Sequence, residues 1–244
     1  MDSETVRGFI RAAILVAVAA VAGMIGLGYP LPPRSDDSAL DRVVAPFSSD
    51  HEPAFEAILR FGRENNIPLG VIVGNQFCST VLIDFRTQRV SVRSVLEELA
   101  KKLPSYHWTL EDNVVVFAPD HIPEATDQFL AVEPPTYAIP EETLQGQALY
   151  AWMNIRAVLR PEEGTAVNIL SSSKPEKWPA LTLNHLTIRQ ILDRLVARGT
   201  GGVWILLPFK DLAKVADHRP FSVMGYSDNV FGQLSTQCPN SEQP

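Results

Sequence analysis

The spacing of apolar and polar positions in the first half of the chain predicts short helices and short strands. Residues 54–65 place apolar side chains at helical spacing between charged ones, which indicates an amphipathic helix. Short apolar runs at 69–73 and 81–85 are typical of buried strands. Ser91 is placed to cap a second helix, which Pro104 ends. A helix, two strands and a helix therefore follow one another in this half.

A hairpin is predicted to follow the second helix. Residues 106–110 and 114–117 are rich in aromatic and β-branched side chains, and the polar segment 111–113 between them is typical of a turn. Thr187 and Gln190 have the spacing of a capping box, so a later helix also has a defined start. The second half of the chain is predicted to contain helices at 144–159 and 187–197, and strands at 165–170, 180–184 and 203–207.

The two halves share a sequence pattern at an offset of 96 residues. Val90–Leu99 and Leu186–Leu195 match position by position in apolar, hydroxyl, arginine, acidic and leucine side chains. Self-similarity at a fixed period indicates repeated structural units, so we interpret the pattern as a duplication. The same offset aligns Trp108 with Trp204 and Val71 with Val167.

The segments that carry the pattern in the first copy are Leu82–Phe85, Val90–Leu99, Tyr106–Trp108 and Asn113–Phe117. In this order they resemble the secretin and TonB short N-terminal domain, over residues 54–118, and residues 136–209 are a weaker match. The resemblance implies an exported β-α-β module that makes protein–protein contacts in the cell envelope and has no catalytic residues. The predicted fold class is α+β, with an N-terminal apolar helix followed by two small β-α-β-β-α-β modules.

The N-terminal region contains an apolar run, residues 12–28, that follows Arg7 and Arg11. Its length approaches that of a membrane-spanning helix, and the arginines favour a cytosolic N-terminus. The small residues at 20–22 also fit the cleavage site of a secretory signal. Uncleaved anchor, cleaved signal and core helix remain open as alternatives, and the first two both export the rest of the chain.

The expected organisation has six parts. They are an anchor or signal segment at 1–29, a spacer rich in Pro, Ser and Asp at 30–50, the first module at 51–120, a linker at 121–138, the second module at 139–210 and a mobile tail at 211–244.

Charge excludes one class of function. The 244 residues include 21 Lys and Arg against 28 Asp and Glu, which gives a formal net charge of −7 at pH 7. Nucleic-acid binding needs a basic surface, so we expect no nucleic-acid partner. The sequence has no phosphate-binding loop, paired metal ligands or nucleophile elbow, so we expect no catalytic residue, metal site or cofactor.

The candidate chemistry consists of isolated residues. Cys78 and Cys238 would both lie in an oxidising compartment after export, so a disulfide between them is possible, and two separate thiols are the alternative. The five histidines have no helical ligand spacing, and we expect His107 and His185 on exposed strand faces. We expect core or edge packing, in preference to a ligand groove, for Trp152, Trp178, Trp204, Tyr137 and Tyr150.

The functional hypothesis is an exported, membrane-anchored envelope protein that binds or scaffolds a protein partner, and is not an enzyme. Its body would lie in the periplasm, whether anchored to the inner membrane or released by cleavage. One alternative is an envelope hydrolase with a site between the two modules. Another is a transmembrane signalling regulator with residues 1–7 in the cytosol. The sequence leaves the oligomeric state and the identity of the partner open.

Overall fold

The structure is a computed structural model that describes residues 38–74, 81–161, 177–198, 201–212 and 219–226. Contacts within the chain group Ser35–Pro244 into one compact unit. Its elements are helices and strands in mixed order with several sheets, which confirms the α+β class. The predicted N-terminal helix, the strand expected at 165–170, and both cysteines lie outside the described residues.

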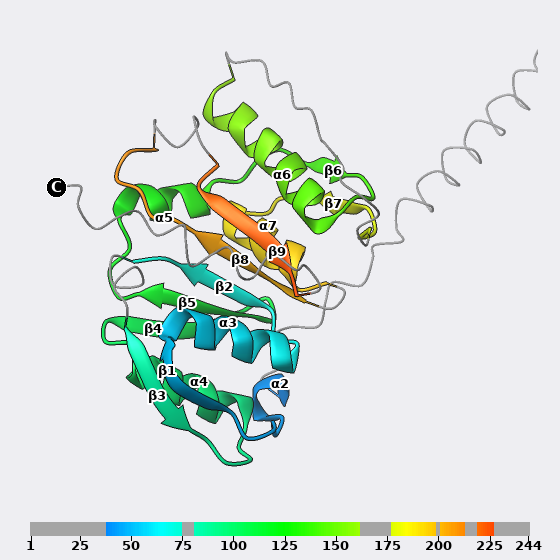
Figure 1. Cartoon of the computed structure of the whole chain (residues 1–244). Coiled ribbons are helices and arrows are strands. Elements are labelled where there is room, and N and C mark those ends of the chain that lie inside the picture. Colours follow the sequence, from blue (N-terminus) through cyan, green and yellow to red (C-terminus); the bar gives the residue numbers. More distant parts are fainter. Residues whose placement is uncertain (1–37, 75–80, 162–176, 199–200, 213–218, 227–244) are drawn as a thin grey trace, which may run out of the picture. The chain divides into compact units, whose positions relative to one another are not determined.

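A five-stranded sheet in the order β4-β5-β2-β8-β9 joins the two halves of the chain (Figure 1). The central strand β2 runs parallel to both β5 and β8. The outer pairs β4–β5 and β8–β9 are antiparallel. The bounds of these strands are β2 Leu69–Ile72, β4 Tyr106–Glu111, β5 Val114–Pro119, β8 Gly202–Leu206 and β9 Phe221–Gly225.

Helices cover both faces of this sheet. On one face α3 (Ala54–Asn65) and α4 (Val92–Lys101) pack with Val71 and Phe117. On the other face α5 (Glu124–Ala131), α6 (Leu144–Leu159) and α7 (Ile188–Val196) pack with the strand side chains that point to that face, such as Val116. Because side chains alternate between the two sides of a strand, a continuous apolar strand contributes to both cores.

Two small antiparallel sheets accompany the main one. The first pairs β1 (Ser48–Pro53) with β3 (Leu82–Arg86), and the second pairs β6 (Tyr137–Ile139) with β7 (Leu181–Leu183). A short helix, α2 (Ser38–Asp41), contributes the buried Leu40 to the core around α3 and α4.

The helix starts predicted from the sequence are confirmed. The Ser91 hydroxyl accepts a hydrogen bond from the Ser94 N–H at 3.2 Å and caps α4. Thr187 and Gln190 form the capping box at the start of α7. The helices predicted at 54–65 and 144–159 have the observed bounds of α3 and α6.

Three predicted segments differ from the structure. The described part of the expected spacer at 30–50 holds α2 and the start of β1, because Leu40 and Phe47 are buried in the core around α3 and α4. The expected linker at 121–138 holds α5 and the start of β6, because Phe129 and Leu130 are buried in the core. The expected mobile tail at 211–244 holds β9, whose side chains Phe221 and Val223 are buried. The average composition of the tail is rich in polar and small residues, and this average hides a short apolar strand.

The described residues contain no helix long and apolar enough to cross a membrane, and the run at 12–28 lies outside them.

The β2–β8 junction depends on a close approach at Gly70. Gly70 lies opposite Trp204 in the parallel register. A Cβ atom at Gly70 would lie 2.3 Å from Cζ2 of the indole, which is too close for any real contact. The fully buried Trp204 ring therefore occupies the space that a side chain on β2 would need.

We expect Gly70→Ala to lower the free energy of unfolding by about 2–3 kcal/mol, because the added methyl group overpacks the junction against the buried indole. Urea unfolding of the single variant measures this loss. In a Trp204→Phe background the smaller ring relieves the contact, so the same substitution should cost less. An equal cost in both backgrounds would show that the indole is not the cause.

Candidate functional site

A buried polar cluster links α7, β8 and the hairpin turn of β4–β5. Asp193 on α7 is 1% exposed and accepts a hydrogen bond from the Trp204 indole Nε1–H at 2.7 Å. Arg189, one helical turn earlier, lies over the Trp204 ring with its Cζ 5.2 Å from the ring centre. The Arg189 guanidinium also contacts Glu111, with 2.9 Å between Nη2 and Oε1. The cluster therefore connects the second half of the chain to the first.

Burial dominates the electrostatics of this cluster. Loss of solvent raises the pKa of Asp193 to about 7, although the Arg189 charge and the Trp204 N–H both lower it. Glu111 and Asp112 add smaller effects that raise it further. The Arg189 Nε lies 3.7 Å from Asp193 Oδ2, which is too long for a hydrogen bond, so this contact is Coulombic. The indole N–H is thus the hydrogen-bond donor that the structure assigns to this carboxyl.

A perturbed carboxyl in a cleft would be a candidate for acid–base chemistry. Asp193 is sealed from solvent on α7, so it contacts no substrate-sized space. The sequence pattern places Glu97 at the matching position of the first copy, and Glu97 is exposed. Sequence reasoning therefore missed Asp193, because the same pattern of residues gives no signal of which acid is buried.

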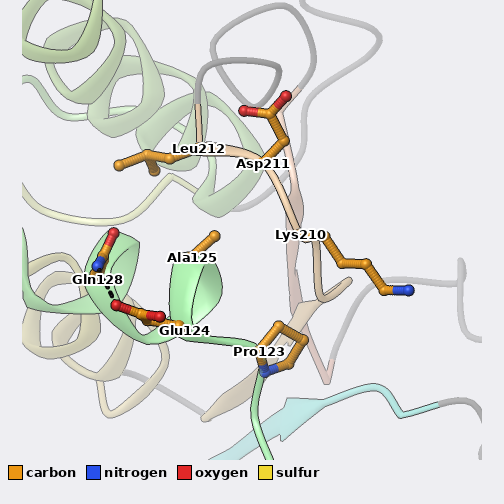
Figure 2. Close-up of a pocket in the computed structure, with 7 residues that line it drawn as sticks. All are labelled: Pro123, Glu124, Ala125, Gln128, Lys210, Asp211 and Leu212. Carbon is orange, nitrogen blue, oxygen red and sulfur yellow. Dashed lines mark hydrogen bonds between the residues drawn. The ribbon is translucent and has the colours of Figure 1, made fainter.

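An open pocket of about 460 Å³ lies where α5 begins, beside the segment that follows β8 (Figure 2). A hydrogen bond of 3.0 Å from Gln128 Nε2 to Glu124 Oε1 crosses part of its wall. The Thr126 hydroxyl holds the two segments together through both the N–H and the carbonyl of Phe209. The lining residues are Pro123, Glu124, Ala125, Gln128, Lys210, Asp211 and Leu212. This set, drawn from the described residues, contains two carboxylates and one ammonium group but no hydroxyl, thiol or imidazole, so it lacks the hydroxyl–imidazole or thiol–imidazole pair of an acyl-transfer site.

The histidines and tryptophans considered in the sequence do not form a common site in the described part of the structure. His107 lies exposed on β4 as predicted, and its Nδ1 is 3.1 Å from Asp120 Oδ1. His185 is exposed but lies just after β7 and not within a strand. Among the residues that the structure describes, no group of three His, Cys, Asp or Glu could hold a metal ion. Core packing is confirmed for Trp152, Trp178 and Trp204, which are all buried.

The β4–β5 hairpin has a two-residue turn, and this turn determines which residues of β4 form backbone hydrogen bonds with β5. Asp112 and Asn113 both have positive φ, as the tight turn of a two-residue hairpin requires. The residues that flank such a turn exchange hydrogen bonds, and the pairs alternate from there along the ladder. The paired positions are Glu111 with Val114, Thr109 with Val116 and His107 with Ala118.

The intervening residues of β4 leave an open sheet edge. The N–H and C=O groups of Trp108 and Leu110 point away from β5, because they alternate with the paired positions. In the part of the chain that the structure describes, β4 has no strand on its other side. An edge of this kind can hydrogen-bond to an added strand.

Comparison of the chain with protein-family models, with curated proteins and with solved structures gave no match.

We expect Asp193→Asn to remove a pH dependence of stability. An unfolded aspartic acid has a pKa near 4, and Asp193 in the folded protein has a pKa of about 7, so the folded state binds more protons between these values. The contribution of the neutral carboxyl is fully present below about pH 4, falls as the pH rises to about 7, and then stays low. The limiting slope is about 1.4 kcal/mol per pH unit.

Urea unfolding from about pH 4 to pH 8 measures this effect as the difference between the unsubstituted protein and the variant. The asparagine oxygen can still accept the indole N–H, so packing is retained. Glu97→Gln is the matched control at the corresponding exposed helix position, and its profile should follow that of the unsubstituted protein. A difference for Asp193→Asn that stays constant with pH would contradict the assignment.

Proposed function

We propose that this chain is an exported, membrane-anchored cell-envelope protein that binds a partner protein by strand addition at the edge of β4, without catalysis. The single observation that supports binding is the outward-facing backbone of Trp108 and Leu110 at the sheet edge. Main-chain hydrogen bonds to an added strand supply affinity in this mode of recognition. Export is supported by the uncharged apolar run at 12–28 and the arginines before it.

We also infer that the body consists of two related β-α-β-β-α-β modules of the secretin and TonB short N-terminal type. The support is a repeated succession of elements: a capped helix and an antiparallel strand pair occur as α4–β4–β5 and again as α7–β8–β9. The two small sheets, β1–β3 and β6–β7, precede the second helix of each module in the same way. The proposed role is that of the family, which is protein contact in the envelope.

Blocking the edge should abolish partner binding. Leu110→Pro removes an outward N–H while leaving the ladder to β5 intact, and Leu110→Val keeps the N–H at the same position. With the full chain as bait in detergent-solubilised envelope, we expect the proline variant to lose the partner that the unsubstituted and valine proteins retain. Thermal unfolding of each bait confirms that it is folded. Equal capture by all three proteins would refute edge binding.

Export has its own test. Cell fractionation should place the full chain in the envelope, and N-terminal sequencing of the same material distinguishes a retained segment from cleavage after the small residues at 20–22. Replacing two apolar residues of the run 12–28 by aspartate should shift the protein to the cytosol, because charges in the apolar core prevent insertion. Cytosolic location of the unsubstituted chain would exclude the export part of the proposal.

A further inference from the structure

The second half of the chain shows how an edge equivalent to that of β4 is filled. The Leu207 N–H donates to the Pro220 carbonyl, and the Tyr226 N–H donates to the Gly201 carbonyl. These bonds determine which residues of β8 hydrogen-bond to β9. Trp204 and Leu206 lie between those residues, so their backbone N–H and C=O groups face β2. The Val73 N–H accordingly donates to the Leu206 carbonyl at 2.9 Å.

The outward positions of β4 and β8 correspond. Trp108 and Leu110 are the third and fifth residues of β4, as Trp204 and Leu206 are of β8. Each strand follows a helix capped by a hydroxyl residue, and each leads into an antiparallel partner. The edge that β2 fills in the second half is therefore the edge that no described strand fills in the first half.

The strand that fills the β8 edge has a distinct chemistry. All four residues of β2 are buried, three of them are apolar, and the strand is parallel to β8. The remaining residue, Gly70, lies opposite Trp204, and the indole ring occupies the space that a side chain at Gly70 would need. An uncharged strand with a glycine opposite the tryptophan is thus what this edge accepts within the chain.

The ionisable side chains of β4 fit the same kind of strand. The His107 imidazole lies 3.1 Å from the Asp120 carboxylate, and Glu111 is paired with Arg189. Both side chains therefore already have partners within the chain, and a charged strand would gain little from them. Trp108 and Leu110 have outward-facing backbone groups, but their side chains are apolar and partly buried against the core around α3 and α4.

We propose that the open edge of β4 takes an extended apolar strand of a partner protein, added in the parallel direction, with a glycine opposite Trp108. This inference rests on the proposed function and specifies the partner of that site. A second folded copy of the chain cannot donate its own β2, because that strand is enclosed between β5 and β8. The proposed strand is that of a different protein.

Peptide binding tests the inference with the full chain in detergent micelles. The probe is a fluorescent peptide with the sequence of residues 67–73, Ile-Pro-Leu-Gly-Val-Ile-Val, followed by lysines for solubility. The matched probe has valine in place of the glycine. By fluorescence anisotropy we expect the glycine peptide to bind, and the valine peptide to bind at least about tenfold more weakly, because its side chain meets the indole.

Variants of the chain locate the binding. Leu110→Pro should abolish binding of the glycine peptide and Leu110→Val should retain it. Trp108→Ala should reduce the preference for glycine over valine, because the ring that excludes the side chain is gone. A spin label at either end of the peptide, read against a label at Asp112, reports whether the strand adds in the parallel direction. An antiparallel arrangement would overturn the proposal.

The failure of this inference is distinct from the failure of the proposed function. Equal binding of both peptides, binding that Leu110→Pro leaves unchanged, or no binding at all overturns the glycine-strand proposal. If Leu110→Pro still removes the envelope partner in those cases, edge binding stands and the partner strand has another chemistry. If Leu110→Pro affects neither peptide nor partner, both proposals fail.

Discussion

The parallel pairing of β2 with β8 is the interaction on which the rest of the structure depends. It joins a strand from the first half of the chain to one from the second half, and it requires Gly70 to lie against the Trp204 indole. Once the indole is placed, its N–H determines where the Asp193 carboxyl lies, and α7 is oriented on the sheet. Arg189 on the same helix then reaches Glu111 at the far hairpin. One glycine thus permits a series of contacts that spans the sheet.

Local structure could be read from the sequence far better than long-range pairing. The helices α3 and α6, the caps at Ser91 and Thr187, and the β4–β5 hairpin follow from periodicity, hydroxyl placement and a polar turn, which are properties of neighbouring residues. The β2–β8 junction does not follow from them, because an apolar strand carries no information about which strand lies beside it. The burial of Asp193 could not be predicted either, because it depends on how β8 and its Trp204 are placed in the sheet.

The matching tryptophans illustrate how position in the sheet changes the role of a residue. Trp204 is on an interior strand and is fully buried, whereas Trp108 is on an edge strand and is only partly buried. The arginines that start the two helices differ similarly, since Arg93 contacts the exposed Asp41 and Arg189 lies over a buried ring. A shared sequence pattern therefore gives an exposed edge in one half and an interior junction in the other.

The separation of β2 and β8 along the chain has a consequence for folding kinetics. Gly70 and Trp204 are 134 residues apart (204 − 70), and closing so long a loop costs chain entropy before the contact is gained. Pairings this distant slow folding. During synthesis β2 emerges long before β8, so its apolar edge stays unsatisfied until most of the chain has been made. A nascent chain of this protein is therefore most prone to aggregation in the interval between the emergence of these two strands.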